Sequence, residues 1–127
     1  MNIIINAGRE KSLLRRHPWI FASAIKHVDD SSAASGSTVD LLSSEGHFLA
    51  RASYSPHSQI RARVWTFTDE PVDKEFFRKR IRAAIELRNV GLDTAGEHRL
   101  LDHQRNTDAY RLIHAESDGI PGLIVDR

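Results

Sequence analysis

The sequence predicts a mixed α+β protein, in which a small β-barrel or twisted sheet precedes a helix and a β-hairpin. Two observations carry this prediction. Short runs rich in β-branched and aromatic residues, separated by turn residues, fill the first half of the chain. The second half holds one long segment with apolar residues at helical spacing, followed by two strand-like runs around a Gly- and Pro-containing turn. The 127 residues suit one average domain or two very small ones.

Five short strands are expected in the first half of the chain. Each is an apolar or alternating run bounded by Pro, Gly or polar turn residues. The runs are residues 3–5, 19–21, 38–42, 48–54 and 60–67. Between the first two, residues 9–16 fit one or two helical turns that end before Pro18. The polar segment 30–37 is expected to be a mobile loop inside the same domain, because strand signals resume directly after it.

The clearest helix prediction covers residues 73–90. Asp73 is a suitable N-cap, and Gly91 is a suitable residue just beyond the end of the helix. Glu75 and Lys79 stand four residues apart and are expected to form an ion pair. An apolar stripe at helical spacing should face the core, and it comprises Phe77, Ile81, Ala84 and Ile85.

A β-hairpin is expected at the end of the chain. Its strands are residues 109–115 and 123–125, joined by a turn at 118–122. The polar segment 93–108 is ambiguous, and a further helical turn around 98–103 is one interpretation. The last strand would leave an edge with open backbone donors. We therefore expect the sequence to be a piece of a longer protein.

Composition excludes several classes of function. The absence of Cys removes disulfides, thiolate nucleophiles and Cys-based zinc sites. No apolar run approaches the roughly 20 residues needed to cross a bilayer, and the first residues lack the cationic start of a secretory signal. The composition thus predicts a cytoplasmic protein that does not bind a membrane.

The charge of the chain is small but unevenly distributed. The formal net charge is +1, with eight Lys and Arg against five acids in residues 1–67 and ten against twelve in residues 68–127. Since the balance changes there, the best domain boundary is residues 68–71. A local cluster of arginines can bind RNA despite a modest net charge, because guanidinium groups bind phosphate and stack on bases.

The first candidate RNA-binding motif is the basic segment that ends in a tryptophan. Lys11 and Arg15 share one face of the predicted helical turn, Arg16 follows, and Trp19 begins the next strand. Basic groups beside an aromatic ring could hold phosphates while a base stacks. The alternative is a solvated basic turn over a leucine core, with Trp19 inside that core.

The second candidate motif is the strand at residues 60–67. Alternation places Arg61, Arg63 and Trp65 on one face, and Arg51 on the preceding strand would join them if the register permits. The alternative is an ordinary sheet with one solvated face, on which arginine packs against tryptophan.

No residue pattern predicts a catalytic, cofactor-binding or metal site. Two acid–histidine pairs, at residues 97–98 and 102–103, are spaced so that a helix would separate their rings. Neither a glycine-rich phosphate loop nor a recognisable Ser–His–Asp arrangement occurs in the sequence.

Three segments together resemble the ribosomal RNA large subunit methyltransferase I family. They are residues 8–21, 53–65 and 110–127, in the same order and register over nearly the whole chain. The resemblance implies S-adenosylmethionine-dependent synthesis of 5-methylcytosine in 23S ribosomal RNA. It implies a PUA-like pseudo-barrel at residues 1–70 and the start of a central α/β domain at 71–127. The Rossmann-like catalytic domain, with its cofactor site and nucleophilic Cys, would lie outside this chain.

The sequence therefore predicts the RNA-binding portion of a methyltransferase, itself inactive and holding no cofactor. The residues assigned to RNA are Lys11, Arg15, Arg16, Trp19, Arg61, Arg63 and Trp65. One alternative is a stand-alone PUA-like RNA-binding or adaptor module without an enzyme. Another is a structural domain that forms a homodimer through its last strand.

Overall fold

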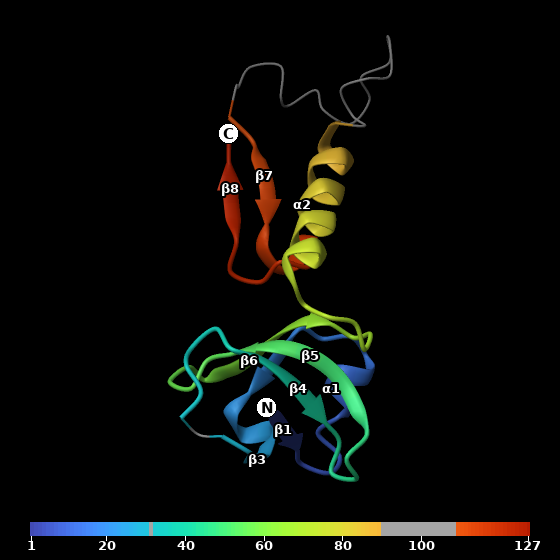
Figure 1. Cartoon of the computed structure of the whole chain (residues 1–127), viewed down its shortest axis with the longest axis vertical. Coiled ribbons are helices and arrows are strands. Elements are labelled where there is room, and N and C mark those ends of the chain that lie inside the picture. The colour runs from blue at the N-terminus through green and yellow to red at the C-terminus, as the bar shows by residue number, and fades with distance from the viewer. Residues whose placement is uncertain (31, 90–108) are drawn as a thin grey trace. The chain divides into compact units, whose positions relative to one another are not determined.

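A computed structural model describes residues 1–30, 32–89 and 109–127 (Figure 1). The chain divides into two compact units, residues 1–72 and residues 73–127, and each is considered by itself below. Within the described part of the chain, no helix has the length and apolar character required to span a membrane. The architecture is mixed α+β, as predicted.

The first unit is a curled sheet of six strands (Figure 1). The strand order is β2-β6-β5-β4-β1-β3, and every pair is antiparallel except β1 and β4. The elements are β1 (Asn2–Ile5), α1 (Lys11–Leu14), β2 (Trp19–Phe21), the 3-10 turn η1 (Ala22–Ala24), β3 (Ile25–Val28), β4 (Thr38–Leu42), β5 (Phe48–Tyr54) and β6 (Ile60–Thr66).

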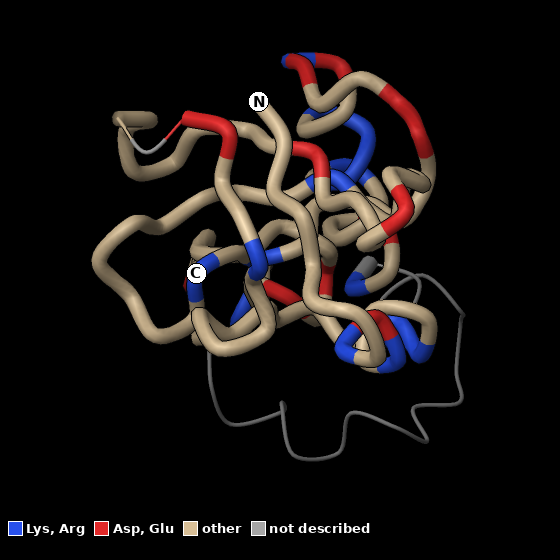
Figure 2. Tube along the Cα trace, turned by 90° about the horizontal axis from the view of Figure 1, so that it is seen from below, with Lys and Arg blue, Asp and Glu red and all other residues tan. Residues whose placement is uncertain are grey.

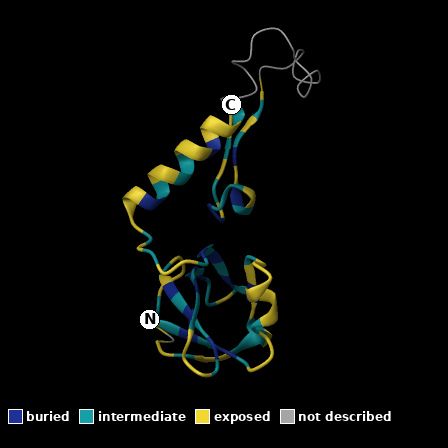
Figure 3. Ribbon diagram, turned by 90° about the vertical axis from the view of Figure 1, so that its right-hand side faces the viewer, coloured by how far each residue is buried: buried dark blue, intermediate teal, exposed yellow. Residues whose placement is uncertain are grey.

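The core of the first unit follows from the alternation of its strands. Alternate residues of β1, β4, β5 and β6 are buried, so each strand turns one face inward (Figure 3). The inward set combines branched side chains with fully buried alanines on β5 and β6, which let the curled sheet close tightly. The central residues are Ile3, Ile5, Ile20, Val39, Leu41, Ala50, Ala52, Ala62 and Val64.

One strand of this sheet was not predicted from the sequence. β3 places Lys26 and His27 in exposed positions between the half-buried Ile25 and Val28, so it has neither an apolar run nor alternation. It forms because β1 offers a free edge, with Ile3 opposite Val28 and Ile4 opposite His27. Tertiary pairing, rather than intrinsic preference, makes this segment a strand.

An ion-pair network fixes the end of the first unit. The Arg51 Nε donates to Asp40 Oδ1 at 2.6 Å, and its Nη2 donates to Asp69 Oδ1 at 2.9 Å. A further guanidinium N–H donates to the carbonyl of Glu70. Arg51 is therefore not part of a cationic face with Arg61 and Arg63, because the acids of β4 and of the connecting segment occupy it.

The second unit contains a helix packed on a two-stranded hairpin. Its elements are α2 (Lys74–Asn89), β7 (Arg111–His114), the 3-10 turn η2 (Ala115–Asp118) and β8 (Ile124–Asp126). Asp73 is the N-cap as predicted, since its Oδ1 accepts the Phe76 N–H at 2.9 Å. The predicted C-terminal residue Gly91 and the helical turn at 98–103 lie outside the described residues.

The predicted inward stripe of α2 is largely wrong. Of the predicted stripe only Ala84 is buried, while Phe77 and Ile81 are half-buried and Ile85 is 36% exposed. The row that faces the hairpin holds the buried Phe76 and Ala84 and the half-buried Arg80 and Arg88. The guanidinium groups replace apolar side chains in this row because the hairpin presents oxygen acceptors to them. Arg80 donates to the carbonyl of Gly119 at 3.2 Å, and Arg88 donates to Asp118. The predicted pair of Glu75 with Lys79 is also replaced, because Glu75 binds Arg78 instead.

A glycine substitution tests the contact between Arg80 and the hairpin. Gly119 has φ 69°, and a Cβ atom there would lie 1.9 Å from the Arg80 Nη1. Gly119→Ala should therefore lose about 2 kcal/mol, from the left-handed backbone and the displaced guanidinium. Gly122→Ala is the control, because Gly122 has φ 85° with open space around it, and it should lose only about 1 kcal/mol. Hydrogen exchange of α2 amides measures both; equal losses would refute a role for Arg80.

Candidate nucleic-acid interface

The exposed basic turn α1 ends in a way that sends the chain directly into β2. The Arg16 N–H donates to the Leu13 carbonyl at 2.8 Å, and the His17 N–H donates to the Ser12 carbonyl at 2.9 Å. Arg16 has φ 60°, the left-handed conformation that closes such a helix end and usually requires glycine. An arginine there costs about 1 kcal/mol of backbone strain, which is typical of residues kept for function.

The strand β2 presents two aromatic rings on the surface. Trp19 is 39% and Phe21 is 47% exposed, while Ile20 between them is buried. The alternative in which Trp19 belongs to the core is therefore wrong. His17 lies edge-on to the Trp19 ring at 5.9 Å between centroids, and its Nδ1 accepts the Trp19 N–H at 3.2 Å. This hydrogen bond holds the backbone of Trp19 at the start of β2.

A surface groove of about 370 Å³ lies between the basic turn and β2. Its lining includes two cations, Arg9 and Lys11, together with His17, Trp19 and Phe21. Figure 2 shows Lys and Arg positions gathered along α1, at the lower right. Of the residues predicted for RNA, Lys11 and Trp19 line this groove, and the other five do not. We call this surface the α1–β2 groove.

Sheet pairing brings the two predicted motifs together. Trp19 stands directly opposite Arg63, and Ile20 stands opposite Ala62, so the inward and outward faces of β2 and β6 agree. The predicted alternation of β6 is confirmed: Ala62 and Val64 are buried, while Arg61, Arg63 and Trp65 are half-buried on the other face. Since β2 and β6 are distant in sequence, their contact follows only from the strand order of the sheet.

Three of the predicted residues, Arg15, Arg16 and Trp65, do not line the groove. The Arg16 guanidinium lies 5.7 Å from the centre of the Phe67 ring, just beyond β6. Trp65 lies where the pairing of β5 and β6 is irregular, between Val64, opposite Ala52, and Thr66, opposite Arg51. Arg15 is exposed on α1, outside the groove lining.

Three residues of the groove were not predicted from the sequence. Phe21 shares a face with Trp19 through the two-residue period of a strand, which was a usable signal in the sequence. Arg9 belonged to the basic segment, but its place in the groove depends on the turn before α1. His17 could not be assigned, because its contact with Trp19 depends on the helix end. Among the described residues, no group of three acids or histidines is placed to hold a metal ion.

Comparison with known proteins agrees with this architecture. A family model described as "PUA-like domain" matches residues 3–67. The chain is 48% identical over 125 residues to ribosomal RNA large subunit methyltransferase I of Vibrio cholerae, which covers 98% of this chain and 29% of the relative. It is 47% identical over 128 residues to the same enzyme of Erwinia tasmaniensis, covering 100% of this chain and 30% of the relative.

Solved structures share the fold at lower identity. A putative SAM-dependent methyltransferase from Streptococcus mutans superimposes with a TM-score of 0.74 at 18% identity, over 99% of this chain and 30% of that chain. A putative methyltransferase in complex with SAH superimposes with a TM-score of 0.75 at 18% identity, with the same coverage.

The curled six-stranded sheet is that of a small PUA-like β-barrel, and the chain belongs to the PUA-like domain family. Over its whole length it is similar to ribosomal RNA large subunit methyltransferase I. The chain spans about 30% of the length of these curated relatives.

Proposed function

We propose that this chain is the RNA-docking portion of an S-adenosylmethionine-dependent methyltransferase that modifies cytosine C5 in 23S ribosomal RNA. The relatives that match the whole chain are ribosomal RNA large subunit methyltransferases, which does not favour a stand-alone adaptor. In this proposal, residues 1–70 bind RNA and residues 71–127 begin a central domain. Methyl transfer and cofactor binding belong to the part of the enzyme outside this chain.

The observation that carries the proposal is the pair of exposed rings on β2 beside the cations of α1. Trp19 and Phe21 offer stacking surfaces, and every base has a face that can stack on them. Lys11 and Arg9 line the same groove, so they can neutralise the phosphates of the stacked nucleotides. Arg63 opposite Trp19, with Arg61 two residues before it, extends the positive surface along β6.

This geometry favours unpaired RNA over a duplex. Stacking on a protein ring needs a base that has left its own stack, as in a loop, a bulge or a single strand. An enzyme that acts on a base must likewise take an unpaired or flipped nucleotide. We infer that the α1–β2 groove holds unpaired nucleotides near the target cytosine.

Trp19→Ala tests the proposed function directly. Removal of one stacking surface should cost about 2 kcal/mol of RNA binding, or roughly 30-fold in Kd. Trp19→Phe is the matched control, and it should keep most of the affinity because a ring remains. The measurement is fluorescence anisotropy of a labelled single-stranded RNA, repeated over a range of salt concentrations. Failure of the unaltered chain to bind RNA at low salt, or equal Kd for Trp19→Ala, would refute the proposal.

A further inference from the structure

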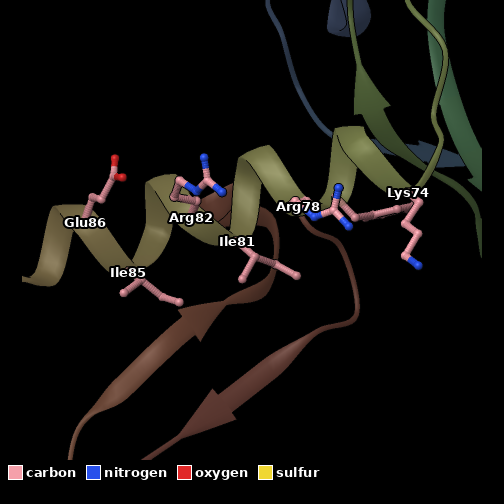
Figure 4. Close-up of a pocket in the computed structure, with 7 residues that line it drawn as sticks. Lys74, Arg78, Ile81, Arg82, Ile85 and Glu86 are labelled. Carbon is pink, nitrogen blue, oxygen red and sulfur yellow. The ribbon is translucent and has the colours of Figure 1, made fainter.

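One row of α2 carries apolar side chains that its own hairpin does not cover. Ile81 and Ile85 stand one helical turn apart, with Ile85 36% exposed and Ile81 half-buried. They line a shallow groove of about 640 Å³, together with the half-buried Phe77. Figure 4 shows Ile81 and Ile85 projecting from the same side of the helix. We call this surface the α2 groove.

The α2 groove is not needed to hold α2 on its hairpin. That contact uses the neighbouring row, in which Phe76 and Ala84 are buried and Arg88 donates three hydrogen bonds to the hairpin. The helix thus presents a row containing two arginines to its own hairpin, whereas Ile81 and Ile85 lie on the neighbouring row that the hairpin does not cover. Full burial of an isoleucine contributes about 1.5–3 kcal/mol, so an open row of this kind marks a surface that another part packs against.

The edges of the α2 groove are mostly basic. Lys74, Arg78 and Arg82 follow one another at four-residue spacing along it, and Glu86 continues the row. Arg78 is occupied by Glu75, which leaves Lys74 and Arg82 as the cations at the edge. A complementary surface would be apolar at its centre with carboxylates beside it. Paired isoleucines favour a protein partner over RNA, because phosphates gain nothing from apolar contact.

We propose that the α2 groove is the docking surface for the part of the methyltransferase that lies outside this chain. This inference rests on the proposed function. The chain accounts for about 30% of the length of its relatives, so most of such an enzyme remains to be placed. The second unit is one helix on a two-stranded sheet, an assembly too small to bury a full core unaided. Contact through Ile81 and Ile85 would add the apolar packing that the second unit lacks by itself.

The experiment compares the same substitutions in the 127-residue chain and in the complete reading frame that carries it. In the 127-residue chain, Ile85→Glu should leave the melting temperature unchanged within about 1 °C, because the Ile85 side chain is already 36% exposed. Ile81→Glu, at a half-buried position, should lower it by about 2 °C. In the complete protein each should lower the melting temperature by about 5 °C. Cleavage between the two parts by a dilute protease should become roughly tenfold faster, because a lost contact worth 1.4 kcal/mol opens the interface tenfold more often. Leu87→Glu is the control, because Leu87 is 71% exposed on the same helix and does not line the α2 groove.

Three results would overturn the inference. The first is an equal melting shift for Ile81→Glu and Leu87→Glu in the complete protein. The second is a dimer of the 127-residue chain that Ile81→Glu abolishes, which would assign the groove to a second copy. The third is loss of RNA affinity in Ile81→Glu, which would assign it to RNA. The RNA test on Trp19 is made in the 127-residue chain alone and concerns a residue of the first unit, so its failure is distinguishable from a failure of the α2 groove experiment.

Discussion

A chain in which Lys11 and Arg15 are both replaced by Glu should lose about 3 kcal/mol of RNA binding, roughly 150-fold in Kd at low salt. Both side chains are exposed, Lys11 at the start of α1 and Arg15 just after its end, and Lys11 lines the groove that contains Trp19. Each phosphate contact that disappears should also reduce the slope of log K against log salt by about 0.7 for a single strand. Anisotropy titrations over several salt concentrations measure both quantities.

The single variant Lys11→Glu is tested beside the double variant, and Lys79→Glu is its matched control. Lys79 is exposed on α2 in the second unit, and its substitution changes the net charge by the same amount. A general effect of net charge would weaken RNA binding equally in both variants, whereas a local site would respond only to Lys11. Tryptophan fluorescence checks the fold of the first unit, since Trp19 and Trp65 both lie there. Equal affinities for the two variants would move the RNA site away from α1.

Asp118→Asn should destabilise the second unit by about 2 kcal/mol. The Asp118 side chain is 7% exposed, and its two oxygens accept from Arg88 at 2.8 and 3.1 Å. The His114 N–H also donates to it, at 2.6 Å. Removal of the charge leaves the largely buried guanidinium of Arg88 without its counter-charge, which costs more than an exposed pair. Hydrogen exchange of the hairpin amides measures the loss.

Asp126→Asn is the matched control for Asp118→Asn. Asp126 also binds an arginine, since Arg111 donates to it at 2.8 Å, but both side chains are substantially exposed. Solvent screens such a pair, so the loss of stability should be much smaller than at Asp118. Equal losses at the two positions would show that burial of the Arg88–Asp118 pair has no part in stability.

The stability of the second unit should also fall in acid. Burial alone would raise the pKa of Asp118, but the Arg88 hydrogen bonds and the His114 N–H outweigh it, and the pKa lies below the ordinary value of 3.8. The folded unit therefore prefers the charged form more than the unfolded chain does. Its contribution is complete above about pH 4 and is lost as the pH falls below that value. Thermal melts from pH 6 to pH 2 should show a steeper decline for the unaltered chain than for Asp118→Asn.

The sequence predicted the strands that alternate and the helix that has a cap. Strands β4, β5 and β6 carry inward apolar residues at every second position, and Asp73 has the side chain that begins a helix. β3 could not be predicted, because its stability comes from pairing with β1, some 20 residues earlier in the chain. The inward face of α2 was assigned wrongly because hydrophobic periodicity cannot foresee an acceptor such as Asp118 opposite Arg88.

The candidate site was predictable in its parts but not as a whole. Lys11 and Trp19 stand out because cations and an aromatic ring occur together in a short segment. The approach of Arg63 to Trp19 depends on pairing across more than 40 residues. The expectation for Arg51 failed for the opposite reason. Its own hairpin suggested that it would join the cationic face of Arg61 and Arg63, but in the fold it pairs with Asp40 and Asp69. Local composition identifies candidate chemistry, while topology decides which groups meet.

The position of β2 at one edge of the sheet has a consequence for synthesis of the protein. Among the described strands it pairs with β6 alone, which the ribosome makes some 40 residues later. Strands β1, β3, β4 and β5 can pair as they emerge from the exit tunnel, but Trp19 and Phe21 must wait for residues 60–66. Because translation proceeds at about 5–20 residues per second, β2 with its two rings stays without its partner strand for a few seconds. The surface assigned to RNA is therefore the last part of the barrel to be completed during translation.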